Sequence, residues 1–84
     1  MLTINFFASI REQLGKDSEA LELPTDVRNV DQLIEILIAG NGQNWSILRD
    51  HSKVLIAVNQ TIVDREHLLE GADEVAFFPP MTGG

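Results

Sequence analysis

Hydrophobic and polar residues alternate at the start of the chain, with an apolar residue at every second position over residues 2–6. A period of two predicts a strand that buries one of its faces. Residues 18–23 alternate in the same way and predict a second strand. Between the two, Ser9 and Glu12 have the spacing of a capping box and Gly15 suits a helix end. The connection between these strands is therefore expected to hold a short helical turn.

The hydrophobic spacing changes to that of a helix over residues 30–38. Apolar side chains recur there at i, i+3, i+4, i+7 and i+8 and form one stripe, made of Val30, Leu33, Ile34, Leu37 and Ile38. Asn29 is the expected N-cap, Gln32 its reciprocal capping-box partner and Gly40 the residue that follows the last turn. This helix is expected to lie across a sheet and to supply half of the core.

Three further strands are predicted in the second half of the chain, after a short helical piece near residues 45–48. Residues 54–59 are apolar on both faces, which is typical of an interior strand. Residues 61–63 predict a short partner strand after a turn. Residues 74–78 predict the last strand, which the two following prolines end because proline cannot donate to the sheet.

This order predicts an α+β fold in which one main helix crosses one face of a mixed sheet. It is the ββαββ layout of a ubiquitin-like β-grasp. We assign residues 1–78 to the β-grasp domain and residues 79–84 to an extended C-terminal tail.

Composition narrows the function. The 84 residues include 6 Lys+Arg against 13 Asp+Glu, a formal net charge of -7, and no cysteine. The length fits one domain, and the acidic balance argues against a nucleic-acid partner. Without cysteine there is no disulfide, thiolate metal site or cysteine nucleophile. No secretory signal is recognisable, and no apolar run approaches the roughly 20 residues of a membrane span, so we expect a cytoplasmic protein that binds no membrane.

The titratable residues suggest no internal active site. His51 and His67 have no metal-ligand spacing, so we expect no metal ion and no bound cofactor. No pair of carboxylates is held at a fixed distance, so the acidic residues are interpreted as a solvated surface that can steer a basic partner. The glycines at 40 and 42 follow a helix and are not accompanied by a lysine, unlike a phosphate-binding loop.

The last ten residues, VAFFPPMTGG, carry no charged side chain. Gly83 and Gly84 have no Cβ, so their backbone can enter a narrow channel, and the α-carboxylate of Gly84 is an anion that can be activated by adenylation. A frayed terminus is the alternative interpretation. We predict that Gly84 is the reacting residue and that the tail enters a partner through five residues, namely Pro79, Pro80, Met81, Thr82 and Gly83.

A second candidate region is an exposed apolar patch. Phe7 and Phe78 have the opposite strand parity to Phe6 and Phe77, so they are predicted to point away from the helix-covered face. Together with Ile62 they are expected to form a partner-binding patch beside the tail. The alternative is that loops cover these rings.

Three segments resemble the MoaD family, the small sulfur-carrying subunits of molybdopterin synthase. They are DEVAFFPPMTGG (residues 73–84), Phe6-Phe7-Ala8 and AVNQT (residues 57–61), and the resemblance extends over essentially the whole chain. Sulfur carriers of the thiazole pathway share the Gly-Gly ending but generally not the Phe-Phe-Pro-Pro segment before it. Two positions depart from the family: Ala72 replaces a usual glycine, whose role is then expected at Gly71, and Met81 replaces a smaller or branched residue.

The resemblance implies a mechanism in which the chain is a cosubstrate and not itself an enzyme. An ATP-dependent adenylating enzyme would convert Gly84 to a glycyl adenylate, and sulfur derived from cysteine would then give a thiocarboxylate. The tail would enter the large synthase subunit, in a heterotetramer of two small and two large subunits, and donate sulfur to cyclic pyranopterin monophosphate. Three alternatives remain: a sulfur carrier of the thiamine pathway, a ubiquitin-like protein modifier and a small stand-alone enzyme.

Overall fold

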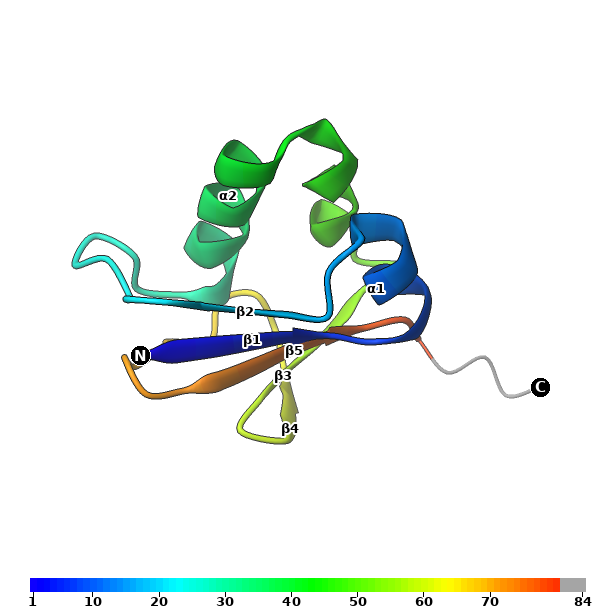
Figure 1. Ribbon diagram of the computed structural model, residues 1–84. Helices are drawn as coiled ribbons and strands as arrows, with labels where there is room; N and C mark the ends of the chain where they lie inside the picture. The colour runs from blue at the N-terminus through cyan, green and yellow to red at the C-terminus, as the bar shows by residue number, and fades with distance from the viewer. Residues whose placement is uncertain (81–84) are drawn as a thin grey trace.

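Five strands form one mixed sheet in the computed structural model, which describes residues 1–80 (Figure 1). Their order across the sheet is β2-β1-β5-β3-β4. The central pair β1·β5 is parallel and the other neighbouring strands are antiparallel. The strands are β1 (Leu2–Phe6), β2 (Ser18–Leu21), β3 (Leu55–Val58), β4 (Thr61–Val63) and β5 (Glu74–Phe78). The predicted α+β ubiquitin-like β-grasp fold is confirmed, and each strand lies within or on its predicted segment.

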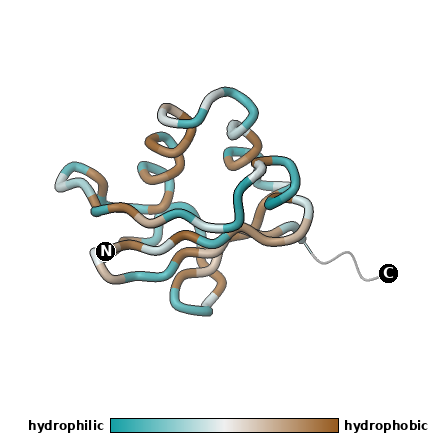
Figure 2. Tube along the Cα trace, in the orientation of Figure 1, coloured by the Kyte–Doolittle hydropathy of each residue, from teal (hydrophilic) through white to brown (hydrophobic). Residues whose placement is uncertain are grey.

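Helices cover one face of this sheet. Helix α2 (Val30–Asn41) and the 3-10 helix η1 (Gln43–Arg49) lie on the same side, while α1 (Ala8–Leu14) lies at the end of the sheet where β1 finishes (Figure 1). Hydrophobic and hydrophilic residues alternate along α2 and η1, whereas the connection between these two helices is hydrophilic or neutral (Figure 2). Among the described residues, no helix lies on the opposite face of the sheet. Within residues 1–80, no helix combines the length and the apolar character that crossing a membrane requires.

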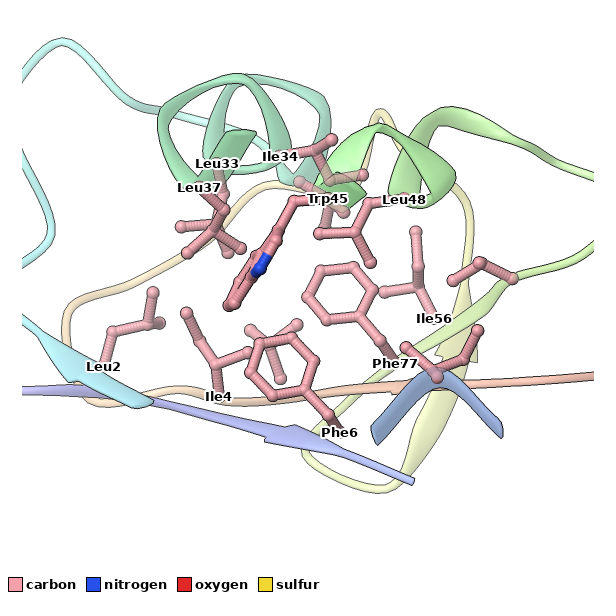
Figure 3. Packing of buried hydrophobic residues seen from close by; sticks show 14 of the residues in the cluster. Leu2, Ile4, Phe6, Leu33, Ile34, Leu37, Trp45, Leu48, Ile56 and Phe77 are labelled. Atoms are coloured by element: carbon pink, nitrogen blue, oxygen red, sulfur yellow. The ribbon is translucent and has the colours of Figure 1, made fainter. Parts of the chain in front are cut away.

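The core lies between the sheet and the helices and is centred on three aromatic rings. Phe6 of β1 stacks on Phe77 of β5 with centroids 5.8 Å apart, and its ring meets that of Trp45 edge-on at 5.2 Å (Figure 3). Leu33 and Leu37 of α2 close the core from above. The alternation in β1 and the stripe on α2 thus point to the same core, as the sequence predicts.

Helix α1 begins differently from the prediction. The predicted capping box of Ser9 and Glu12 is wrong, because the helix starts at Ala8 and Phe7 is its N-cap, with no side-chain capping bond. The Phe7 carbonyl accepts the backbone N–H groups of Ile10 at 3.1 Å and Arg11 at 3.3 Å. Strand β1 therefore passes directly into the helix and leaves no room for a separate polar cap.

The ends of α2 follow the prediction in part. The Asn29 side chain accepts the N–H of Gln32 at 2.9 Å, as expected, but the Gln32 side chain accepts the N–H of Arg28, at 2.6 Å, in place of that of Asn29. Gly40 is not the terminal glycine. The helix continues to Asn41 and ends at Gly42, whose φ of 104° requires glycine and whose N–H donates to the Ile38 carbonyl.

The turn before β5 does not need a glycine with positive φ. Neither Gly71 nor Ala72 has a left-handed backbone. The expectation that a glycine's role has moved from position 72 to Gly71 is therefore wrong, and Ala72 fits its position without strain.

Candidate functional site: the outer face of the sheet and the C-terminal tail

The tail follows directly on the end of β5, beside the end of β1. Because these two strands are parallel, with Phe6 opposite Phe77, both finish at the same end of the sheet. The Phe7 N–H donates to the Phe77 carbonyl at 3.0 Å, one residue beyond the end of β1. Pro79 and Pro80 come next and are half-buried. Phe7 therefore lies at the base of the tail.

The face of the sheet without helices is apolar beside this point. On β5 the buried residue Phe77 alternates with Phe78, which lies opposite Leu55 of β3. In the next row across the sheet, Ala76 of β5 pairs with Ala57 of β3, and Ala57 pairs with Ile62 of β4. Phe7 joins them because its extended backbone, with φ -121° and ψ 150°, directs its side chain away from that of Phe6. We call this set the outer apolar face: Phe7, Leu55, Ala57, Ile62, Ala76 and Phe78.

The members of the outer apolar face differ in how far they are exposed. Ile62 is 67% exposed and Phe7 is 47% exposed, whereas Phe78 is half-buried. The alternative that loops cover the rings thus does not apply to Phe7. The structure brings the three predicted patch residues onto one face, and their role in partner binding stays a prediction.

Sequence reasoning missed three members of the outer apolar face, Leu55, Ala57 and Ala76. Their signal was present in the sequence. A strand that is apolar on both faces, such as residues 55–58, contributes to the uncovered face of a sheet as well as to its core. The two alanines are paired across β5 and β3, and Ala57 is also paired with Ile62 of β4.

The groups with displaced pKa values lie away from the outer apolar face. A hydrogen bond from Arg49 lowers the pKa of the Glu35 carboxyl, and hydrogen bonds from Ser52 lower the pKa of Asp50. Burial lowers the pKa of Arg65. Hydrogen bonds explain the shifts of Glu35 and Asp50, and burial explains that of Arg65. None of these three groups forms an acid–base pair beside the tail.

Among residues 1–80, no three side chains of His, Asp or Glu come together as metal ligands, and these residues enclose no pocket. The other predicted tail residues, Met81, Thr82, Gly83 and Gly84, lie outside the described residues.

Comparison with known proteins identifies the family. Residues 4–84 match the model of the ThiS family, which is nearly the whole chain. The chain belongs to the ThiS family. Its relatives include the molybdopterin synthase sulfur carrier subunits of Escherichia coli K12, 43% identical, and of Haemophilus influenzae, 40% identical, each match covering all of both chains. The resemblance to the MoaD family is thereby confirmed.

Solved structures agree with this fold. A Pyrococcus furiosus protein described as subunit 1 of a molybdopterin converting factor superposes with a TM-score of 0.73 at 29% identity, over 95% of this chain and 97% of that chain. The small archaeal modifier protein 1 of Haloferax volcanii superposes with a TM-score of 0.75 at 18% identity, over the same shares of the two chains. At that lower identity the likeness speaks for the fold alone.

Proposed function

We propose that this ThiS-family chain is the sulfur carrier subunit of a molybdopterin synthase. The observation that carries the proposal is the match, over the full length of both chains, to the Escherichia coli subunit of that name. The geometry supports it, since the strand that precedes the Gly-Gly tail ends beside the outer apolar face. Carrier chemistry needs a docking surface close to the reactive terminus, and an apolar face at the base of the tail is consistent with this need.

In the proposed reaction the carboxylate of Gly84 attacks the α-phosphate of ATP in a partner enzyme, and pyrophosphate leaves. The resulting glycyl adenylate is attacked by a persulfide sulfur derived from cysteine, and AMP leaves. A thiol then cleaves the acyl disulfide and releases the thiocarboxylate. The chain contains no cysteine, so it has no thiol of its own that would compete for the activated carbonyl. ATP is consumed by the partner and is not a resident cofactor of this chain.

The length of the tail links the reaction to the docking surface. Six extended residues, 79–84, span at most about 20 Å, at roughly 3.3–3.6 Å per residue. An enzyme that acts on Gly84 must therefore come within that distance of Phe78. The outer apolar face begins there, and exposed apolar surface next to a reactive group is typical of a partner-binding site. We assign this face to the large subunit of the synthase, which would complete a heterotetramer of two small and two large subunits.

The role of each tail residue follows from its chemistry. Gly84 carries the adenylate and then the sulfur, and Gly83 allows passage because it has no Cβ. Pro79 and Pro80 restrict the base of the tail, which lowers the entropy lost when it is bound. The catalytic groups for sulfur transfer to cyclic pyranopterin monophosphate would then belong to the large subunit, in the cytoplasm.

Intact-mass spectrometry tests the reaction. After incubation with the adenylating enzyme, ATP and a sulfur donor, the chain should gain the mass difference between one sulfur atom and one oxygen atom. Deletion of Gly84 should abolish the gain while fluorescence of Trp45 shows an intact core. A truncated chain that is still converted, or that still supports synthase activity, would refute the proposal.

The two related functions are separated by complementation. A strain that lacks its molybdopterin synthase small subunit should be rescued, and a strain that lacks the sulfur carrier for thiamine should not. A ubiquitin-like protein modifier, the alternative function, would instead form isopeptide adducts that resist thiol reagents. Such adducts without rescue of molybdopterin synthesis would favour that alternative.

A further inference from the structure

Left-handed backbone conformations precede or follow two residues of the outer apolar face, Phe7 and Ile62, within the described part of the chain. Among residues 1–80, three residues other than glycine have a positive φ: Ala8 at 51°, Asn59 at 52° and Gln60 at 71°. Ala8 follows Phe7 directly, and the turn of Asn59 and Gln60 leads into the strand that carries Ile62. The two residues of the outer apolar face that are most exposed are thus both held by left-handed turns.

The two turns differ in what compensates the strain. A left-handed backbone crowds the Cβ of an L-residue against its own carbonyl, and asparagine tolerates this better than other residues. The Asn59 side chain is also fixed by hydrogen bonds to Asp73 and to the Glu74 N–H. Ala8 has only a methyl group, which is exposed, and can form no such bond. Nothing in its own side chain offsets the strain.

 The position of the strain at Ala8 matters because the preceding residue, Phe7, lies between β1 and α1 and takes part in the hydrogen bonding of both the sheet and the helix. Its N–H donates to the Phe77 carbonyl at 3.0 Å and extends the pairing of β1, while its carbonyl accepts the first N–H groups of α1. The chain changes from strand to helix within one residue, and Ala8 adopts the left-handed conformation at that point. The extended backbone of Phe7 directs its side chain to the outer apolar face, and the turn at Ala8 holds that backbone on its carbonyl side.

Burial does not hold the Phe7 ring in place, since the residue is 47% exposed. A ring of this kind is oriented by its backbone, and a backbone that is fixed before binding reduces the entropy lost on association. Glycine at position 8 would adopt the same φ without strain, but it would also allow many other conformations. An alanine in this position therefore keeps the turn defined at a cost in stability, as strained residues at functional sites often do.

We propose that Ala8 is a positioning residue, whose left-handed backbone fixes Phe7 on the outer apolar face in the orientation that the large synthase subunit binds. The inference rests on the proposed function, because it takes this face as the docking surface. It predicts that Ala8→Gly raises the stability of the chain but lowers its affinity for the large subunit. A purely structural role would move both in the same direction.

The test compares L-alanine, glycine and D-alanine at position 8 in the full chain, which is short enough for chemical ligation. Urea unfolding followed by Trp45 fluorescence gives stability, and titration calorimetry with the purified large subunit gives affinity. Glycine and D-alanine both relieve the strain, so both should raise the urea midpoint. Only D-alanine keeps the backbone restricted to positive φ. It should bind as L-alanine does, while Ala8→Gly should bind about threefold to tenfold more weakly.

Two further variants make the outcome decisive. Gln60→Gly relieves the same kind of strain in the other turn, whose shape is still held by the hydrogen bonds of Asn59 to Asp73 and Glu74, so it should raise the midpoint without changing the affinity. Phe7→Ala should weaken binding; if it does not, the docking face of the proposed function is wrong. If Phe7→Ala weakens binding but Ala8→Gly binds as tightly as the natural chain, the docking face stands and the role of Ala8 is overturned. Weak binding by the D-alanine chain would overturn it as well.

Discussion

The side-chain amide of Asn59 donates to the carboxylate of Asp73 at 2.9 Å and ties the β3–β4 turn to the start of β5. Asn59 also accepts the Glu74 N–H at 3.0 Å through its side chain, and its own N–H donates to the Glu74 carbonyl at 2.8 Å. The other oxygen of Asp73 accepts the N–H of Glu70 at 2.8 Å. Two turns that are distant in sequence are therefore held together at the end of the sheet away from the tail.

Replacing the two residues of the β3–β4 turn by glycine should have opposite effects. Asn59→Gly keeps the left-handed backbone but removes two side-chain hydrogen bonds, one of them to a carboxylate, so it should lower the free energy of unfolding by about 1–3 kcal/mol. Gln60→Gly removes only strain and should raise it by about 1 kcal/mol. Urea unfolding followed by Trp45 fluorescence measures both. Effects of the same sign would contradict the network described above.

The ion pair between Glu35 and Arg49 predicts a pH dependence of stability. It joins α2 to η1, with Arg49 Nε donating to Glu35 Oε2 at 2.7 Å and a second bond between Arg49 Nη2 and Glu35 Oε1. The hydrogen bond from Arg49 lowers the pKa of Glu35. The ion pair therefore contributes fully to stability above the ordinary glutamate pKa of about 4.3, and this contribution is lost as the pH falls through the lower pKa of the folded state. Both side chains are about half exposed, so the effect should be small and should weaken with salt.

Glu35→Gln tests this dependence. The variant should unfold at a lower urea concentration than the natural chain at neutral pH, and the difference should shrink near pH 3 as the natural carboxylate is protonated. Glu12→Gln is the matched control, an exposed glutamate on α1 that forms no ion pair within the described part of the chain. A difference that is constant with pH, or equal in the two variants, would argue against the ion pair.

Arg65 is expected to be the charged residue on which stability depends most. Its Nη2 donates to the carbonyl of Leu48 at 2.9 Å and lies 3.4 Å from that of Val54, which joins the end of η1 to the start of β3. Arg65→Met keeps much of the volume but leaves these part-buried acceptors without a donor, so it should cost about 1–3 kcal/mol. Arg65→Lys keeps the charge, so its free energy of unfolding should lie between those of Arg65→Met and the natural chain. Urea unfolding measures all three chains, and an unchanged Arg65→Met midpoint would refute this role.

The sequence predicts the strands and the main helix because their signal is periodic. The alternation that ends at Phe6 and the stripe that begins at Val30 repeat over several residues, and the buried positions follow them. Isolated signals were less informative. The spacing of Ser9 and Glu12 is that of a capping box, yet a strand passes directly into α1, and no local pattern reveals that the chain turns at Ala8.

Tertiary contacts account for the other differences. The first N–H groups of α2 are satisfied partly by a distant loop: Val30 donates to the His67 carbonyl at 3.1 Å and Asp31 to that of Arg65 at 2.9 Å. Such partners cannot be found by reading residues 26–32. The sequence predicts the candidate patch because side chains in a strand alternate between its two faces. Its full extent required the strand order, which brings Leu55 beside Phe78.

The net charge predicts how association depends on salt. With 13 acidic and 6 basic side chains, the protein should be steered toward a basic surface on the adenylating enzyme or on the large subunit. The association rate should therefore fall as the Debye length shortens to about 8 Å and below, while the dissociation rate changes little. Stopped-flow measurements over a series of salt concentrations test this. A rate independent of salt would leave the outer apolar face and the tail as the main recognition elements.

Ile62 and Leu68 form a matched pair for testing the docking surface. They are exposed to 67% and 70% respectively, but Ile62 lies on the outer apolar face, whereas Leu68 pairs with Asn29 at the start of α2. Because neither is buried in the free protein, replacement by serine should change the free energy of unfolding by less than about 0.5 kcal/mol in each case.

Binding to the large subunit should separate the two variants. Ile62→Ser should weaken it about tenfold or more, since burying an isoleucine side chain at an interface contributes about 1.5–3 kcal/mol. Leu68→Ser should bind as the natural chain does. Titration calorimetry at fixed salt measures both affinities. Equal affinities for the two variants would mean that the large subunit does not reach β4, and loss of binding by Leu68→Ser alone would move the docking surface to the helical side of the molecule.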